Sequence, residues 1–135
     1  FKRLLRDIQA CIAEASAIDG LKDEAAALAK YLGLAGQTTQ RLTATMSSGE
    51  IRLGLANAAS YLTLMGHLCI AWMWLRQAVV AAKSTAGSET DRDFYAGKLQ
   101  ACRFFFRHEL PAIEHLAQLL MSLDATTLET RPEWL

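Results

Sequence analysis

The three histidines are the side chains best suited to bind a metal ion or move protons. They are His67, His108 and His115. His108 and His115 are seven residues apart, so they share a face if they share a helix, and each is next to a glutamate. A carboxylate-bridged metal site in a helical bundle needs Glu-x-x-His pairs on separate helices, and the sequence has none. We therefore predict no metal site, and we interpret His67 as a hydrogen-bonded residue of a core or an interface.

A second group with possible chemistry is cationic. Arg103 and Arg107 are one helical turn apart and can form a small patch, with Lys98 nearby. One interpretation is contact with an anion or an acidic partner. The other, which we favour on the sequence alone, pairs the arginines with Glu109, Asp93 or helix ends.

Other catalytic patterns are missing from the sequence. It has no glycine-rich phosphate loop, no Rossmann fingerprint and no Ser-His-Asp spacing, so we expect no catalysis by these residues alone. The formal net charge is zero, which argues against nucleic acid as a partner. Cys11, Cys69 and Cys102 stand among apolar residues without a zinc-like spacing, which indicates reduced, buried thiols in a cytoplasmic protein.

The elements that must position these residues are organised around a long uncharged stretch. No charged residue occurs between Arg52 and Arg76, and a run of this length raises the possibility of a membrane span. Asn57, Ser60 and His67 form a narrow polar line on a helix through this stretch. We therefore predict a central helix of a bundle that is buried on most sides, and no transmembrane segment.

Hydrophobic periodicity predicts an all-α fold with four helices and short connections. It indicates an antiparallel up-and-down four-helix bundle whose last two helices are long, the last one kinked near Pro111 but continuous. We expect the helices at about residues 2–18, 23–46, 51–86 and 90–125, followed by an extended tail at 126–135.

Local signals refine these boundaries. Ser47 with Glu50 and Thr90 with Asp93 have the spacing of capping boxes, which predicts helix starts at both places. Gly33 and Gly36 weaken the second helix by about 1 kcal/mol each. We expect that a neighbouring helix approaches closely there, or that the helix breaks locally.

The last two helices have more apolar surface than a four-helix core can enclose. Successive helical residues are about 100° apart, so consecutive large side chains such as Phe104, Phe105 and Phe106 cannot all face one core. The same argument applies around Trp74. We predict that Phe104 and Trp74 contact another domain or subunit.

The chain begins at Phe1 with a helical pattern already established, so we expect a fragment from the C-terminus of a longer chain. We expect residues 1–135 to form a single helical domain.

Several short motifs resemble the C-terminal extension of the larger bacterial acyl-CoA dehydrogenases, a group that includes enzymes acting on methylthio-propanoyl-CoA. The motifs, which are spread over nearly the whole chain, are Tyr61-Leu62 with Gly66, Phe94-Tyr95 with Lys98-Leu99, Arg103-Phe104-Phe105 and Glu109-Leu110-Pro111. The charged pair His108-Glu109 departs from what we expect of that family.

The resemblance implies a parent flavoprotein that oxidises acyl-CoA to 2-enoyl-CoA. In that family a glutamate removes the α-proton, a hydride passes from the β-carbon to FAD, and the glutamate lies in the dehydrogenase core, upstream of Phe1. Neither Glu109 nor Glu114 takes that role. The resemblance implies an accessory domain that packs on the core and supports a homo-oligomer, with Lys98, Arg103 and Arg107 as candidate contacts to CoA phosphates or the core. The alternative is a freestanding helical interaction module without enzymatic activity.

Overall fold

The computed structural model describes residues 2–84 and 87–134, which form helices and no strand. The all-α prediction is confirmed. The α-helices are α1 (Lys2–Ser16), α2 (Lys22–Ser47), α3 (Ile51–Leu55), α4 (Ala58–Lys83), α5 (Glu89–Phe104), α6 (Ala112–Met121) and α7 (Thr126–Glu129). The described residues also include two short 3-10 helices at Asp19–Leu21 and Pro132–Trp134 and a π-helical segment at Phe105–Glu109.

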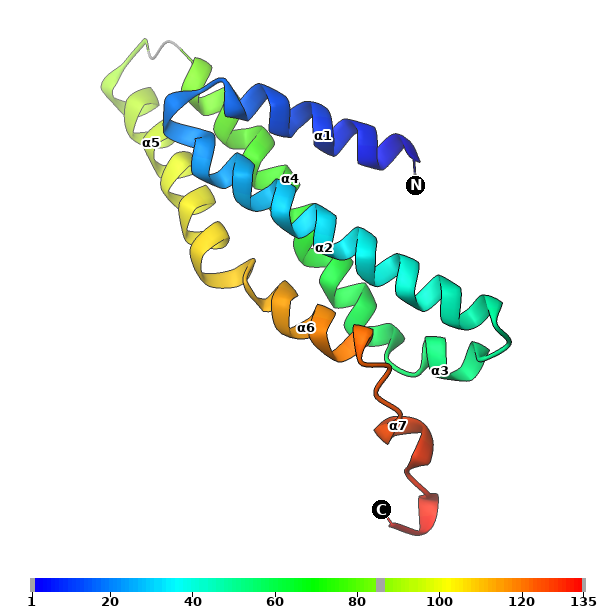
Figure 1. Ribbon diagram of the computed structural model, residues 1–135. Coiled ribbons are helices and arrows are strands. Elements are labelled where there is room, and N and C mark those ends of the chain that lie inside the picture. The colour runs from blue at the N-terminus through cyan, green and yellow to red at the C-terminus, as the bar shows by residue number, and fades with distance from the viewer. Residues whose placement is uncertain (1, 85–86, 135) are drawn as a thin grey trace.

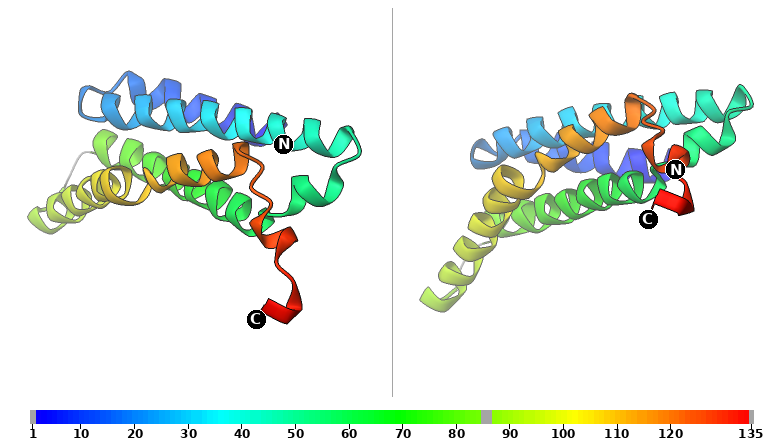
Figure 2. Two further views of the ribbon diagram at one scale, coloured as in Figure 1. Left: turned by 60° about the horizontal axis from the view of Figure 1, so that its bottom comes forward. Right: turned by 90° about the horizontal axis from the view of Figure 1, so that it is seen from below.

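Within the described residues, α1, α2, α4, α5 and α6 enclose the core. The chain reverses direction between α1 and α2, again across α3 into α4, and again between α4 and α5 (Figure 1). α1 packs against α2 and α4, and α6 packs against α2 and α4. α5 packs mainly against α4, and its first turns extend away from the other helices (Figure 2).

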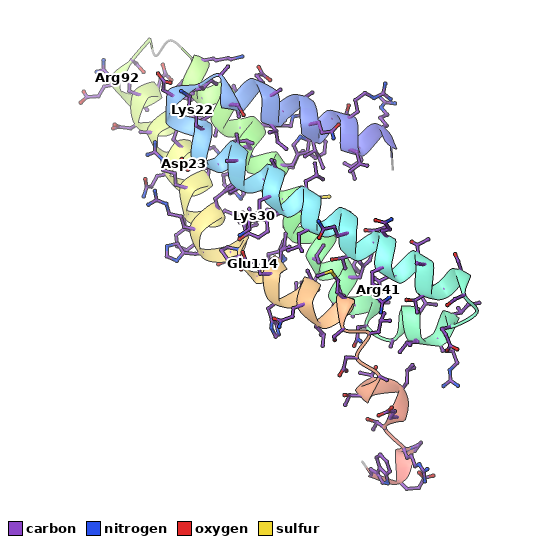
Figure 3. All side chains as sticks on the ribbon, in the orientation of Figure 1. Lys22, Asp23, Lys30, Arg41, Arg92 and Glu114 are labelled. Atoms are coloured by element: carbon purple, nitrogen blue, oxygen red, sulfur yellow. The ribbon has the colours of Figure 1, made fainter. Side chains whose placement is uncertain are left out.

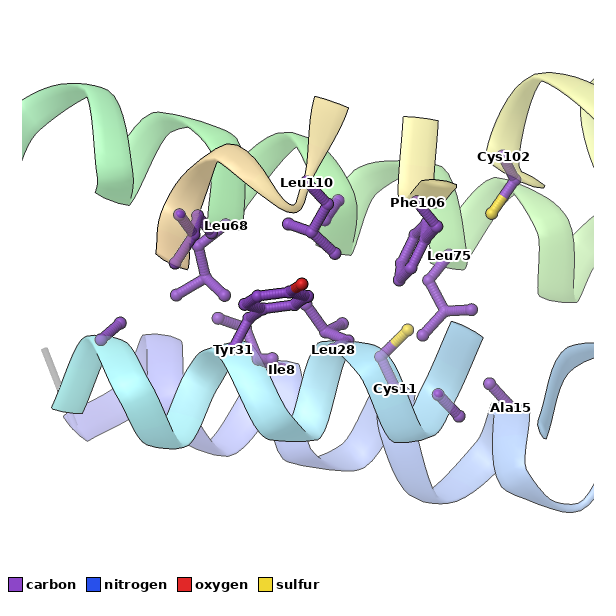
Figure 4. Close-up of a cluster of buried hydrophobic side chains, with 14 of the residues drawn as sticks. Ile8, Cys11, Ala15, Leu28, Tyr31, Leu68, Leu75, Cys102, Phe106 and Leu110 are labelled. Atoms are coloured by element: carbon purple, nitrogen blue, oxygen red, sulfur yellow. The ribbon is translucent and has the colours of Figure 1, made fainter. Parts of the chain in front are cut away.

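The core is made of aliphatic side chains with a few sulfur and aromatic groups, as Figure 4 shows. Each of the main helices contributes residues at steps of three and four, which is why the sequence stripes found these helices. Fully buried large side chains include Ile8, Leu28, Leu64, Leu68, Leu75, Cys102, Leu110, Ile113 and Leu120.

The predicted helix at 51–86 is two helices in the structure, α3 and α4. The break lies at Ala56 and Asn57, where the Asn57 side-chain amide donates to the Asp124 carbonyl oxygen at 2.9 Å. α4 has 26 residues, about 39 Å at 1.5 Å per residue, so it is shorter than predicted. It ends at Lys83, and residues 85–86 of the predicted end lie outside the described residues.

Neither predicted capping box forms. The hydroxyl of Ser88 accepts from the Asp91 amide at 3.1 Å, so the cap of α5 lies two residues before Thr90. Ser47 belongs to α2, and Glu50 precedes α3 without a side-chain cap. A capping motif signals a helix start, but the residue that takes the cap depends on where the preceding loop ends.

Pro111 does more than kink the last predicted helix. It has no N–H to donate to the carbonyl four residues earlier, and the Leu110 amide donates to Phe105 O, five residues back, at 2.9 Å. The result is the π-helical segment, a turn at 110–111 and a new helix, α6, that begins at Ala112. The apolar period continues in phase on both sides, which is why the sequence indicated one helix.

Two further expectations differ from the structure. The segment 126–135, expected to be extended, holds α7 and the Pro132–Trp134 turn within its described part. α2 continues through Gly33 and Gly36 without a break, and a Cβ atom at either glycine would meet nothing within 4 Å. The predicted close approach is therefore absent at these glycines, although α1 residues such as Leu5 line a pocket with them.

One glycine does mark a close approach. A Cβ atom at Gly54 in α3 would lie 2.4 Å from Met46 Cγ and 3.3 Å from the Leu42 carbonyl oxygen of α2. Because residue 54 has no side chain, α3 packs closely against the C-terminal turns of α2, and the chain then reverses direction into α4.

We predict that Gly54→Ala lowers the free energy of unfolding by about 1–3 kcal/mol, because the Met46 side chain must shift and the backbone of α2 at Leu42 leaves little room for the methyl group. Denaturant unfolding followed by circular dichroism measures the change. The matched control is Gly97→Ala in α5, where a Cβ atom meets nothing within 4 Å. There the substitution should stabilise the protein by about 0.5–1 kcal/mol. Equal effects at the two positions would contradict the close approach.

Candidate functional site

The side of α4 that faces away from the core carries an apolar stripe. Leu62, Ile70, Met73 and Val80 are 73 %, 48 %, 36 % and 63 % exposed. At about 100° per residue these positions fall within roughly 80° of one another, opposite the buried side chains of α4. We call Leu62, Ile70, Met73 and Val80, with Gly66 between the first two, the outer stripe. The prediction that α4 is buried on most sides is therefore wrong for this face.

The composition of α4 also meets the criterion for a membrane span. It is the one helix of the described residues long and apolar enough to cross a membrane, and 22 % of its most apolar stretch is buried. The same helix packs against α1, α2, α5 and α6 and supplies core residues such as Leu64, Leu68 and Leu75. In this fold α4 is a core helix with one uncovered apolar face.

A groove of about 480 Å³ lies between α4 and α5, beside the outer stripe. We call it the α4–α5 groove; its lining residues are Met73, Arg76, Gln77, Val80 and Ala81 of α4 with Phe94, Tyr95 and Lys98 of α5. The lining contains two cations and no carboxylate. Phe94 is 59 % exposed, so an aromatic ring forms the outer edge of the groove.

The aromatic rings hold Lys98 in place at this groove. Its Nζ atom lies 5.4 Å from the centroid of the Phe94 ring and 5.8 Å from that of Trp74. Arg76 lies over the ring of Trp72, with its guanidinium carbon 5.5 Å from the centroid. Neither cation forms an ion pair within the described residues. Arg76 also lines a neighbouring pocket with the carboxylates of Asp7 and Glu14, without an ion pair to either. Neither positive charge is therefore used up in an ion pair of the described residues.

Arg103 and Arg107 do not form one patch with Lys98. At about 100° per residue, Arg103 is roughly 140° around α5 from Lys98, so the two side chains leave different faces of the helix. Arg103 and Arg107 make no ion pair with Glu109, Asp93 or any other described carboxylate. The structure therefore does not show the predicted pairing with Glu109 or Asp93. The third predicted position, at a helix end, agrees with Arg103 in the last turn of α5 and Arg107 in the last turn of the π-helical segment.

The two predicted interface aromatics differ in exposure. Phe104 is 55 % exposed, and its ring stacks on that of His108 with centroids 4.6 Å apart. Trp74 is partly buried against the core and lies beneath Lys98. The role of both as contacts to another domain or subunit stays a prediction.

The histidines do not come together. His67 Nδ1 lies 2.9 Å from the Thr63 carbonyl oxygen, and its ring is tilted against Phe105. Within residues 2–84 and 87–134 no group of three or more His, Cys, Asp or Glu side chains is placed to hold a metal ion.

Glu114 is held in an ion pair that joins α6 to α2. Its Oε1 atom accepts from Lys30 Nζ at 2.6 Å and from the Tyr31 hydroxyl at 3.0 Å (Figure 3). The hydrogen bond from Lys30, followed by that from Tyr31, lowers the pKa of the Glu114 carboxyl. Burial raises the pKa of Tyr31, so this phenol stays neutral and donates. The carboxylate is part of the packing of α2 on α6.

The cysteines are free, and two of them are buried. Burial raises the pKa of the Cys102 thiol to about 12, and burial also raises the pKa of the Cys11 thiol. A thiolate is the reactive form of cysteine, so neither side chain is a nucleophile near neutral pH.

Comparison with known proteins identifies the family of this chain. Residues 4–131 match the family described as acetyl-CoA dehydrogenase C-terminal like. This chain belongs to that family. It is also 32 % identical to the broad-specificity linear acyl-CoA dehydrogenase FadE5 of Mycobacterium tuberculosis, over 96 % of this chain and 24 % of FadE5. The chain is therefore an acyl-CoA dehydrogenase C-terminal domain, and it spans about a quarter of the length of the curated relative that it matches.

The described residues of this acyl-CoA dehydrogenase C-terminal domain do not fit FAD. A dinucleotide needs convergent donors for its pyrophosphate, commonly at a helix N-terminus. The buried side-chain donor without a partner is Trp72 Nε1. Trp72 lines a pocket of about 300 Å³ that Asp7, Glu14 and Arg76 also line. The two carboxylates outnumber the one cation, so the net negative charge of this pocket opposes a pyrophosphate. We assign no flavin chemistry to the described residues.

Sequence reasoning found Lys98 but missed Arg76 and Phe94 as members of the same site. The sequence did contain a sign of the α4 side of this site, because Met73, Gln77 and Val80 recur at steps of four and three on the face opposite the core. What the sequence did not contain was the pairing of this face with the first turns of α5.

We predict that Glu114→Gln destabilises the domain at pH 7 and that the difference from wild type closes in acid. Because the pKa of Glu114 is lowered on folding, its contribution is present above the unfolded pKa near 4.5 and is lost as the pH falls through the folded pKa. Urea unfolding from pH 7 down to pH 3 measures this.

The matched control for that series is Glu109→Gln, which removes an exposed carboxylate that has no ion pair among the described residues. A difference between wild type and Glu114→Gln that stays constant in acid would contradict the role of the ion pair.

Proposed function

We propose that this chain is the accessory C-terminal domain of an FAD-dependent acyl-CoA dehydrogenase, that it packs on the dehydrogenase core and that it supports a homo-oligomer. The observation that carries the proposal is the outer stripe of α4, a row of exposed apolar side chains on the helix that also organises the core. Monomeric proteins rarely leave apolar patches of this kind uncovered unless they bind something there. Family membership supplies the neighbour, because the relative that the chain matches is about four times as long.

The parent enzyme would oxidise acyl-CoA to 2-enoyl-CoA in the cytoplasm. FAD and the catalytic glutamate would belong to the dehydrogenase core. The domain itself would contribute packing and assembly.

The test starts from the gene that encodes this chain. We expect its reading frame to continue upstream into a dehydrogenase core, and the purified full-length protein to contain flavin by its absorbance near 450 nm. It should also reduce an artificial electron acceptor when acyl-CoA is added. A reading frame that encodes only this helical domain, or a full-length protein without flavin, would contradict the proposal and favour a freestanding interaction module.

A contact between Arg103, Arg107 and the CoA phosphates is a second proposal for the parent enzyme. It is supported by the two guanidinium groups, which have no ion pair among the described residues. Charge-assisted hydrogen bonds to phosphate contribute roughly 1.5–3 kcal/mol each.

For this contact we predict that the double substitution Arg103→Ala with Arg107→Ala raises KM for acyl-CoA by about tenfold or more in the full-length enzyme, while kcat changes little. Steady-state kinetics measures both constants. Arg92→Ala, which removes an exposed cation from the first turn of α5, is the matched control. An unchanged KM in the double variant would remove the contact.

A further inference from the structure

We propose that the α4–α5 groove is the docking site for an apolar segment of the dehydrogenase core that carries carboxylates, and that these carboxylates pair with Arg76 and Lys98. This inference rests on the proposed function, and it adds the surface on which the core docks and the chemistry of the segment that docks there.

The shape and composition of the groove indicate an apolar occupant. Its lining is mostly aliphatic and aromatic, and it continues into the outer stripe through Met73 and Val80, which belong to both. A partner that fills the groove therefore also covers much of the exposed face of α4. Burial of apolar surface is the main favourable term in such contacts.

The charges of the groove indicate the polar chemistry of that occupant. Arg76 and Lys98 flank the apolar lining, and neither has an ion pair among the described residues. On α5, Asp91 is engaged at the helix start, where the Ser88 hydroxyl donates to its carboxylate at 2.9 Å. Asp7 and Glu14 line a neighbouring pocket with Arg76, outside the α4–α5 groove, and Glu14 is bound by Lys83. Two free cations beside an apolar surface favour a partner with negative charge.

The same charges argue against a second copy of this domain as the occupant. In a two-fold symmetric contact centred on the groove, Arg76 and Lys98 of one copy would face the same cations of the other. Like charges that meet at an interface are unfavourable. A segment of the dehydrogenase core is not related to the groove by symmetry, so it does not have to place the same cations opposite Arg76 and Lys98.

The first test places a photo-crosslinking benzoylphenylalanine at Val80 of the full-length protein, with the same group at Gln40 as the control. Val80 lines the groove and is 63 % exposed, whereas Gln40 is an exposed residue in the C-terminal half of α2. Peptide mapping should find Val80 crosslinked to a core segment that has an Asp or Glu within two helical turns of the crosslinked residue. A crosslink to a second copy of α4–α5, or to a core segment without a carboxylate, would overturn the proposal. So would a yield no higher than at Gln40.

The second test reverses the charges. Arg76→Glu with Lys98→Glu should lower the yield of the Val80 crosslink by about fivefold or more, since two favourable charge pairs become repulsive. Arg41→Glu with Arg52→Glu, at exposed positions of α2 and α3, changes the net charge equally and should leave the yield unchanged. Arg41 lies at the far end of α2 from the groove (Figure 3).

A reciprocal Asp or Glu→Lys substitution in the crosslinked core segment should restore the yield, which a merely structural effect of the reversal would not do. The milder pair Arg76→Ala with Lys98→Ala serves if the reversal unfolds the domain, and it should lower the yield in the same direction. Equal yields in the reversed and control proteins would overturn the proposal.

These experiments test the proposed function and the proposed docking site separately. A wild-type protein that contains flavin and oxidises acyl-CoA, but crosslinks elsewhere from Val80, retains the proposed function and loses the groove as docking site. A protein without flavin or activity loses the proposed function itself.

Discussion

Apolar side chains surround α4 on almost its whole circumference, and the rest of the domain depends on how that surface is covered. α1, α2 and α6 cover one side and form the core with Leu64, Leu68 and Leu75. α5 covers a flank, where it leaves the groove with Phe94 at its edge. The remaining face, the outer stripe, has no covering element among the described residues. An uncovered apolar face of this kind is typical of a surface that binds a partner, which is why we propose that the dehydrogenase core covers it.

Polar contacts fix the geometry of this arrangement more than they add chemistry. Lys30, Tyr31 and Glu114 join α2 to α6, and Asn57 joins the start of α4 to the chain after α6. The Thr39 and Tyr61 hydroxyls, 2.9 Å apart, connect α2 to α4. These bonds lie on the core side of α4. The cations on the groove side, Arg76 and Lys98, have aromatic neighbours and form no ion pair among the described residues. The polar contacts named here therefore join the core helices, whereas the two groove cations have no ion pair among the described residues.

The sequence predicted those features that depend on local periodicity. α2 was predicted at 23–46 and runs over Lys22–Ser47, because its apolar stripe is regular and flanked by clear breaks. The break between α3 and α4 was not predicted. It depends on the close approach of Gly54 to Met46 and on the Asn57–Asp124 bond, whose residues are 67 positions apart. Similarly, the sequence indicated Lys98 as a candidate site residue because of its charge. Its separation from Arg103, and its position in the same groove as Arg76, depend on how α5 is rotated against α4. Tertiary contacts of this kind leave no periodic signal in one chain.

The central claim is that the outer stripe is covered in the full-length protein. Thiol labelling of Val80→Cys under native conditions measures this directly, with Gln40→Cys as reference and peptide mapping to separate the native cysteines. The account predicts that Val80→Cys reacts at least about tenfold more slowly than Gln40→Cys in the full-length protein and at the same rate after unfolding, since local opening must precede labelling of a covered site. Equal rates in the native protein would contradict it.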